Sequence, residues 1–372
     1  MKTKVNRKDN GDRKMKRYIA AIGVGLLVLC CLEWMKQWPG VVERYYSLGF
    51  YPLFSYVPKT LFGWIPFSVG DMLYATLVVV LCGLFLRVLI DLCKGRWRDA
   101  STAMLRAVLF VLGLYIYFYI SWGLHYYRVP LQEQFGLQVD RIDRSDYLTV
   151  LDRYVDEVNV LRAQLDTGVM DTERATRELE AVMRADDNGL HMLSRTQVRV
   201  KHPISSKLAS YFTVTGYLNP FTQEVQVNAL MPKTAYPFTV VHELSHQMGI
   251  GFEDECNFIA FLVLHQHPDI WYRYAAYYET VQYLLRPLYY EDKGRYDAYV
   301  AKLSVAVKRD MEQERLFWQA YRGPLDRLMN IFYSGYLQHN NQPEGMARYS
   351  LMSRLVVAWE MQKAGTGTAS GD

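Results

Sequence analysis

Three long runs without charged residues lie in the first third of this 372-residue chain, and they restrict its fold more than any other feature. They cover about residues 18–34, 72–86 and 107–124, and Glu33 is the only charged residue in them. A segment of this length crosses a bilayer as a helix, because every backbone polar group must find its partner within the segment. The pattern therefore predicts three transmembrane helices, at about 18–35, 70–90 and 105–124.

Basic residues are distributed unevenly around these runs. The tail 1–17 and the connection 87–106 are rich in Lys and Arg, whereas the connection 36–70 holds only three basic residues and four prolines. A signal peptide is the competing interpretation of the first run, but no small-residue cleavage site follows it. The positive-inside rule then places the N-terminus in the cytoplasm and everything after residue 124 outside. We expect 36–70 to be a loop with interfacial segments.

Composition limits the partners of the chain. The formal net charge of +4 is too small to indicate a nucleic-acid partner. The five cysteines have neither the spacing of a disulfide framework nor that of a cysteine-based zinc site. The bilayer and a peptide or protein substrate, a membrane protein included, are the partners that we expect.

Residues 126–363 are predicted to form one mainly α-helical domain with a small β-hairpin or sheet, between the membrane domain 18–125 and a disordered tail 364–372. Apolar stripes, caps and period-two alternation locate its elements. The predicted helices cover about 145–165 (capped by Ser145), 172–184, 268–285, 296–321, 324–337 and 346–363. The predicted strands cover 196–200, 211–217 and 224–228.

The motif His-Glu-x-x-His occurs once in this domain, at His242, Glu243 and His246. Residues four apart share one face of a helix, so both imidazoles can bind one metal with Glu243 beside them. Such a site suits zinc, which lowers the pKa of a bound water to about 7 while the Glu accepts its proton. Gly249 and Gly251 permit a sharp turn after the second histidine.

The segment after that turn carries a resemblance. Together, the motif and the run Glu253-Asp254-Glu255-Cys256-Asn257 resemble the zincin superfamily, and more closely its gluzincin-like branch. The resemblance implies a zincin-like α+β domain with one Zn²⁺ per chain, Glu253 as the third ligand, and Asn257 bracing a ligand histidine. It extends to a family of bacterial integral-membrane proteins with this core, which implies the bacterial cytoplasmic membrane as the location.

Some alternatives stay open within this resemblance. Only six residues separate His246 from Glu253, fewer than gluzincins usually have, and Glu255 is a competing ligand that points about 200° around the same helix. Tyr333 and Tyr336 are candidate oxyanion donors, with core packing as the alternative. The hairpin with Asn219, Val225 and Val227 is either a substrate shelf beside the active-site helix or simply part of the scaffold.

The function that these observations predict is hydrolysis of a peptide bond by a membrane-bound zinc metallopeptidase, with Glu243 as general base. Two other classes of protein share the same features. A metal-binding pseudoenzyme or membrane sensor would keep the metal without general protease activity, and a membrane scaffold would carry no metal.

Overall fold

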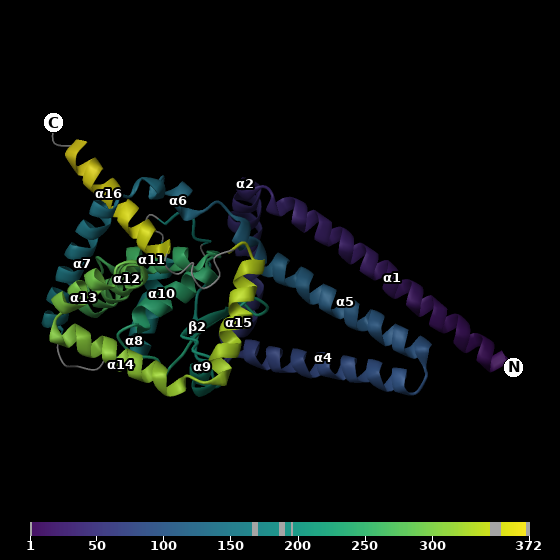
Figure 1. The fold of residues 1–372 in the computed structure, drawn as a ribbon. Coiled ribbons are helices and arrows are strands. Elements are labelled where there is room, and N and C mark those ends of the chain that lie inside the picture. The colour runs from purple at the N-terminus through teal and green to yellow at the C-terminus, as the bar shows by residue number, and fades with distance from the viewer. Residues whose placement is uncertain (1, 166–169, 186–189, 195, 343–350, 370–372) are drawn as a thin grey trace.

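In this computed structural model the chain is described at residues 2–165, 170–185, 190–194, 196–342 and 351–369. The described part is mainly helical and has a small three-stranded sheet. Long N-terminal helices extend from one side of a helical body that contains the sheet (Figure 1). The predicted class, mainly α with a small sheet behind three helices able to span a membrane, is confirmed.

The three long helices are α1 (Lys2–Lys36), α4 (Val69–Cys93) and α5 (Trp97–Ser121). They run side by side in Figure 1, and α5 packs against both of the others. Among the described residues, Arg13–Lys36, Val69–Cys93 and Trp97–Ser121 are long and apolar enough to cross a membrane. At most 11% of the residues in each apolar window are buried within the protein, so these surfaces need an apolar cover such as lipid.

The connection between the first two spans is helical, and the prediction of a loop over 36–70 was wrong. It consists of α2 (Pro39–Val41), the π-helical segment η1 (Val42–Phe50) and α3 (Tyr51–Gly63). Pro39 and Pro52 lie in the first turns of α2 and α3. Proline is tolerated there because the first backbone N–H groups of a helix have no partner within it.

Two predictions about the helices of the body were wrong, one about a cap and one about a boundary. Helix α7 (Arg144–Gln164) is capped by Asp143, whose carboxylate accepts the backbone N–H of Asp146, and not by Ser145. The helix predicted at 296–321 is two helices, α13 (Lys293–Lys302) and α14 (Val305–Tyr321). They separate because the Ser304 hydroxyl accepts the N–H of Val307 and starts α14.

The other helices of the body follow the predicted periodicity more closely. Helix α8 (Thr172–Arg184) has the predicted bounds. Residues 343–350, where the last helix was predicted to begin, lie outside the described residues, and α16 continues past the predicted tail boundary to Ala369. The remaining helices are η2 (Gly123–Tyr127), α6 (Leu131–Gln134), η3 (Val139–Arg141), α12 (Ile270–Glu291), α15 (Pro324–His339) and α16 (Met352–Ala369).

The sheet has the order β1-β3-β2, with β1 (Val200–Lys201) parallel and β2 (Gly216–Asn219) antiparallel to the central β3 (Glu224–Val227). The predicted strands at 196–200 and 211–217 were displaced. Residues Ser206–Tyr211 form helix α9, which was not predicted and which includes Tyr211, the first residue of the predicted second strand. The Ser205 hydroxyl caps this helix by accepting the N–H of Leu208. Strand β2 is an edge strand, with β3 as its only neighbour among the described strands.

Two helices lie at the centre of the main hydrophobic core: α10 (Tyr236–Gln247) and α11 (Glu253–Leu264). Every residue of α10 is buried. This helix packs against α11, α8, α12, β2 and β3. Burial of α10 on all sides holds its polar side chains in fixed positions, and these include the His-Glu-x-x-His motif.

Candidate metal centre

Helix α10 ends directly after the His-Glu-x-x-His motif, at a turn that contains Gly249. Gly249 adopts a φ of +93°, which only glycine adopts readily, and the N–H of Ile250 returns to the carbonyl of Ser245. The chain then approaches the membrane segments closely, since a Cβ atom on Gly251 would lie 2.8 Å from the His125 carbonyl oxygen. The two predicted turn glycines thus allow α11 to start at Glu253, with only six residues between it and His246.

Three side chains converge between α10 and α11. One potential ligand atom from each of His242, His246 and Glu253 lies within 4.8 Å of the others, and all three residues are buried. The Nε2 atom of His242 is 3.2 Å from Glu253 Oε2, and that of His246 is 3.5 Å from Glu253 Oε1. Two imidazole nitrogens and one carboxylate oxygen are a donor set that suits a catalytic zinc site.

Hydrogen bonds on the far side of each imidazole set its orientation. The Nδ1–H group of His242 donates to Asn257 Oδ1 at 2.7 Å, and that of His246 donates to the Ile250 carbonyl at 2.8 Å. The Nε2 atom is then the ring nitrogen that each histidine turns toward Glu253 and offers as a possible ligand. Metal-binding histidines in proteins are commonly held in this way. Asn257 thus lies where the sequence resemblance implied.

The buried thiol of Cys256 also approaches His246, at 3.2 Å from Nδ1. Burial raises the pKa of this thiol to about 12. The thiol therefore stays protonated at neutral pH, as a small packing residue would.

The carboxylate of Glu243 lies beside this cluster. The residue is 4% exposed, and its Oε2 atom has no hydrogen-bond partner among the described residues. A Cβ atom on Gly216, the first residue of β2, would lie 2.6 Å from Glu243 Cγ, so glycine makes room for this side chain. Burial raises the pKa of Glu243 to about 7, against the opposing effect of the two imidazoles. A carboxylate with this pKa can accept and return a proton near neutral pH.

The charge of Glu253 is set by its neighbours. Burial alone would raise its pKa, but His246 and His242 hold it well below the usual range. The Tyr333 hydroxyl donates to Glu253 Oε1 at 2.7 Å. The neighbouring Tyr336 hydroxyl instead accepts a hydrogen bond from Tyr126 at 3.1 Å. Of the two predicted tyrosines, Tyr333 touches the proposed ligand.

Glu255, the competing ligand, points away from the cluster. Its Oε1 atom accepts the backbone N–H of Leu131 at 2.7 Å, which connects α11 to the start of α6. Two residues along a helix correspond to about 200° of rotation, so Glu253 and Glu255 cannot face the same point. The geometry favours Glu253 as the third ligand.

A cavity of about 1010 Å³ opens onto the motif residues and Glu253. Tyr333, Tyr336 and the first three residues of β2 line it. Of the predicted hairpin contacts, Asn219, Val225 and Val227 are fully buried and are not among the lining residues. The side of the hairpin that reaches the cavity is therefore Gly216–Leu218, because Val225 and Val227 of β3 point into the hydrophobic core.

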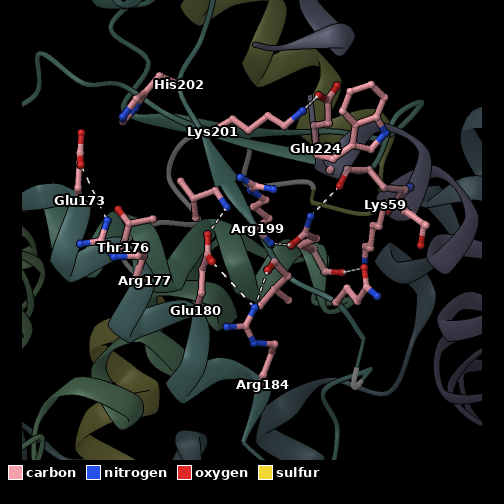
Figure 2. Close-up of a pocket in the computed structure, with 18 residues that line it drawn as sticks. Lys59, Glu173, Thr176, Arg177, Glu180, Arg184, Arg199, Lys201, His202 and Glu224 are labelled. Carbon is pink, nitrogen blue, oxygen red and sulfur yellow. Dashed lines mark hydrogen bonds and ion pairs between the residues drawn. The ribbon is translucent and has the colours of Figure 1, made fainter. Parts of the chain in front are cut away.

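A second cavity, of about 830 Å³, lies beside β1 and α8 (Figure 2). It is lined by many charged side chains, but several of these are paired with each other. Lys201 pairs with Glu224 at 2.5 Å, Arg184 lies 4.0 Å from Glu180, and Arg177 lies 3.9 Å from Glu173 (Figure 2). We therefore assign these ion pairs to the scaffold.

The residues that hold the C-terminal end of α10 were not predicted from the sequence. The carbonyl of His246 accepts Trp122 Nε1–H at 3.1 Å, and that of Gln247 accepts the Tyr51 hydroxyl at 2.8 Å. Lys59 Nζ donates to the same Gln247 carbonyl at 3.0 Å. Trp122 lies directly before η2, and Tyr51 and Lys59 lie in α3. All three are more than 120 residues in the chain from the carbonyls that they bind, so no local sequence pattern connects them to the motif.

Comparison with known proteins identifies the family. A family model described as "Protein of unknown function (DUF3810)" matches residues 46–357, and the chain belongs to this family. No curated protein and no solved structure matches the chain. The match covers most of the membrane domain and the whole candidate metal centre.

Proposed function

We propose that this member of the DUF3810 family is a membrane-bound zinc metallopeptidase with a zincin-like domain. The observation that carries the proposal is the convergence of His242, His246 and Glu253, with both imidazoles oriented from behind. A buried carboxylate, Glu243, lies beside this donor set, and one of its oxygens has no hydrogen-bond partner in the described part of the chain. An ordinary structural cluster does not need that last feature, whereas a hydrolase does.

Each residue of the site has its own role in the proposed reaction. His242, His246 and Glu253 would hold one Zn²⁺, which when bound supplies a Lewis acid that polarises a carbonyl and activates water. Glu243 accepts a proton from the attacking water at Oε2 and returns it to the amine that leaves when the C–N bond breaks. Asn257 keeps His242 in the required tautomer. Tyr333 holds Glu253 through its hydroxyl group.

The same proposal includes an orientation. With three spans, the basic N-terminal tail in the cytoplasm and the basic connection between α4 and α5 on the same side, the helical body lies outside the cytoplasm. The bacterial cytoplasmic membrane is the proposed location. The substrate is a peptide or protein that is accessible from that face.

Metal content tests the proposal directly. We expect one zinc per purified full-length chain by mass spectrometry, lost in His246→Ala and weakened in Glu253→Ala. Glu255→Ala is the matched control, because Glu255 lies on the same helix and binds the Leu131 N–H instead. Wild-type protein that takes up no zinc, or Glu255→Ala protein that loses it while Glu253→Ala keeps it, would contradict the proposed ligand set.

Glu243→Gln separates an enzyme from a metal-binding sensor. The variant should bind zinc like the wild type, because Glu243 is not a ligand in the proposed site. Cells that depend on the protein should lose its function, since the amide cannot accept the proton. Full biological function in this variant would favour the pseudoenzyme alternative.

A further inference from the structure

Helix α15 occupies a special place between the helical body and the membrane helices. It lies on the side of the body from which α4 and α5 extend, and it runs across their direction (Figure 1). Its C-terminal end is attached to α5 and the residues that follow it. The contacts are Tyr115 with His339 at 2.9 Å, Tyr119 with Asn340 at 3.1 Å, and Tyr126 with Tyr336 at 3.1 Å.

The two faces of α15 differ in their surroundings. One face lines the metal-centre cavity with Met329, Asn330, Tyr333 and Tyr336. The other face carries four large apolar side chains that are not covered by the protein. Their exposed fractions are 43% for Leu325, 50% for Leu328, 73% for Ile331 and 66% for Phe332.

Such a face is unfavourable in water and favourable in the interfacial layer of a bilayer. A helix that lies along a membrane surface buries one apolar stripe among the lipids and keeps its other face with the protein or the water. The attachment to α5, itself a candidate span, places α15 near the level at which the bilayer begins. The apolar face of α15 thus continues the lipid-facing surfaces of α4 and α5, and lipid is what covers it.

The cavity behind α15 reaches the same level. Met72, Tyr74 and Ala75 from the first turns of α4, and Phe118 from α5, belong to its lining. These four residues lie within the segments that can span the membrane. Helix α9 and the residues before it also line the cavity, and Ile204 and Leu208 there are 60% and 50% exposed.

We infer that α15 lies in the membrane surface with Leu325, Leu328, Ile331 and Phe332 among the lipids, and that the cavity receives a membrane-anchored polypeptide from the bilayer side. The choice of substrate rests on the proposed peptidase function, whereas the lipid contact of α15 does not. A polypeptide fits because β2 is an edge strand that lines the cavity, and an extended chain can add to such a strand by backbone hydrogen bonds.

Photo-crosslinking in the full-length protein tests the lipid contact. The protein is placed in vesicles of phosphatidylcholine and phosphatidylglycerol with p-benzoylphenylalanine at position 332, and lipid adducts are measured by mass spectrometry. Val79, 71% exposed on α4, is the positive control position. Tyr290, 76% exposed at the end of α12, is the negative control, since the adjoining α13 lies on the side of the body away from the membrane helices (Figure 1).

We expect lipid adducts at positions 332 and 79 and at least about tenfold less at position 290, because crosslinking needs direct contact with lipid. The same label at position 331 guards against a local effect of one substitution. Adducts at position 79 without adducts at 331 and 332 would overturn the lipid contact. This readout is independent of zinc and of catalysis.

A pair of zinc-binding probes tests the route to the cavity. One probe is a dipeptide hydroxamate, and the other is the same compound with a lauroyl chain that partitions into the vesicles. At equal total concentration, the acylated probe should bind the zinc-loaded protein about tenfold more tightly. The lauroyl chain concentrates this probe in the bilayer, and a site that opens toward the bilayer is exposed to that higher local concentration. Equal or weaker binding of the acylated probe would overturn entry from the bilayer.

Two further outcomes separate this inference from the proposed function. If neither probe binds, the metal centre itself is contradicted, and with it the polypeptide substrate, while the lipid adducts at 331 and 332 still decide the membrane contact. If the zinc-loaded protein instead releases fatty acid from vesicle lipid, the site hydrolyses lipid, and the choice of a polypeptide substrate is overturned.

Discussion

At the scale of single residues, the candidate centre is built from two histidines that are each held by contacts at both ring nitrogens. The Nε2 atoms of His242 and His246 face Glu253, and their Nδ1 atoms are engaged from behind. Spacing along one helix explains why the two histidines meet. It does not explain the Asn257 contact, which depends on how α11 crosses α10.

Asn257→Ala should weaken zinc binding about 10- to 100-fold, because His242 loses the acceptor that holds its tautomer and ring orientation. Zinc affinity of the purified protein, measured by competition with a chelator, checks this. Asn159→Ala is the matched control, since Asn159 also makes two hydrogen bonds, to Lys302 and Ser304, but lies outside the metal cluster. Equal zinc affinity of the Asn257→Ala and Asn159→Ala variants would show that Asn257 does not support the site.

At the scale of elements, helix propensity and apolar periodicity predicted much of the body. Helix α8 has the predicted bounds, and α10, which carries the His-Glu-x-x-His motif, ends at the predicted glycine turn. Errors arose where a short cap decided the outcome. Ser205 and Ser304 each start a helix by accepting a backbone N–H. The first helix, α9, was not expected and includes Tyr211, where a strand was expected to begin, and the second start divided an expected long helix.

Gly249→Ala should destabilise the protein by about 2 kcal/mol, because alanine at a φ of +93° is strained and its Cβ would lie 2.8 Å from His125 Cε1. Gly136→Ala is the matched control. Gly136 also has a positive φ, of +64°, but the only nearby side-chain atom is 4.0 Å away. Thermal unfolding in detergent should therefore show a larger loss for Gly249→Ala. Equal losses would mean that the close approach to His125 does not matter.

At the scale of the whole molecule, the membrane segments and the helical body form one structure around α10. Arg128 follows η2, and its buried side chain donates to the Gly249 carbonyl at 2.6 Å. The same guanidinium pairs with Glu43 of η1 through two contacts of 2.5 and 2.7 Å. The turn after His246 is thus held by a residue that is itself fixed by the connection between the first two spans.

Glu43→Ala should lower the free energy of unfolding by about 3 kcal/mol, since it leaves the buried Arg128 charge without its carboxylate. The effect should appear as a lower unfolding midpoint, together with faster zinc loss. Glu312→Ala is the comparison, because the Glu312–Arg315 pair is exposed, and exposed pairs contribute little. A midpoint in Glu43→Ala as high as in Glu312→Ala would contradict this coupling between the two parts of the molecule.

The sequence by itself determined the three apolar spans, the mainly helical class and the meeting of His242 with His246, because each depends on the local period of a helix or on uninterrupted apolar length. It also narrowed the proposed third metal ligand to two glutamates of one helix. Only the tertiary structure distinguished Glu253 from Glu255 and placed the Tyr333 hydroxyl against Glu253. It also showed that Tyr51 and Trp122 donate hydrogen bonds to the last carbonyls of α10. Those contacts join residues that are distant in the chain, and their energies depend on packing directions that no local pattern contains.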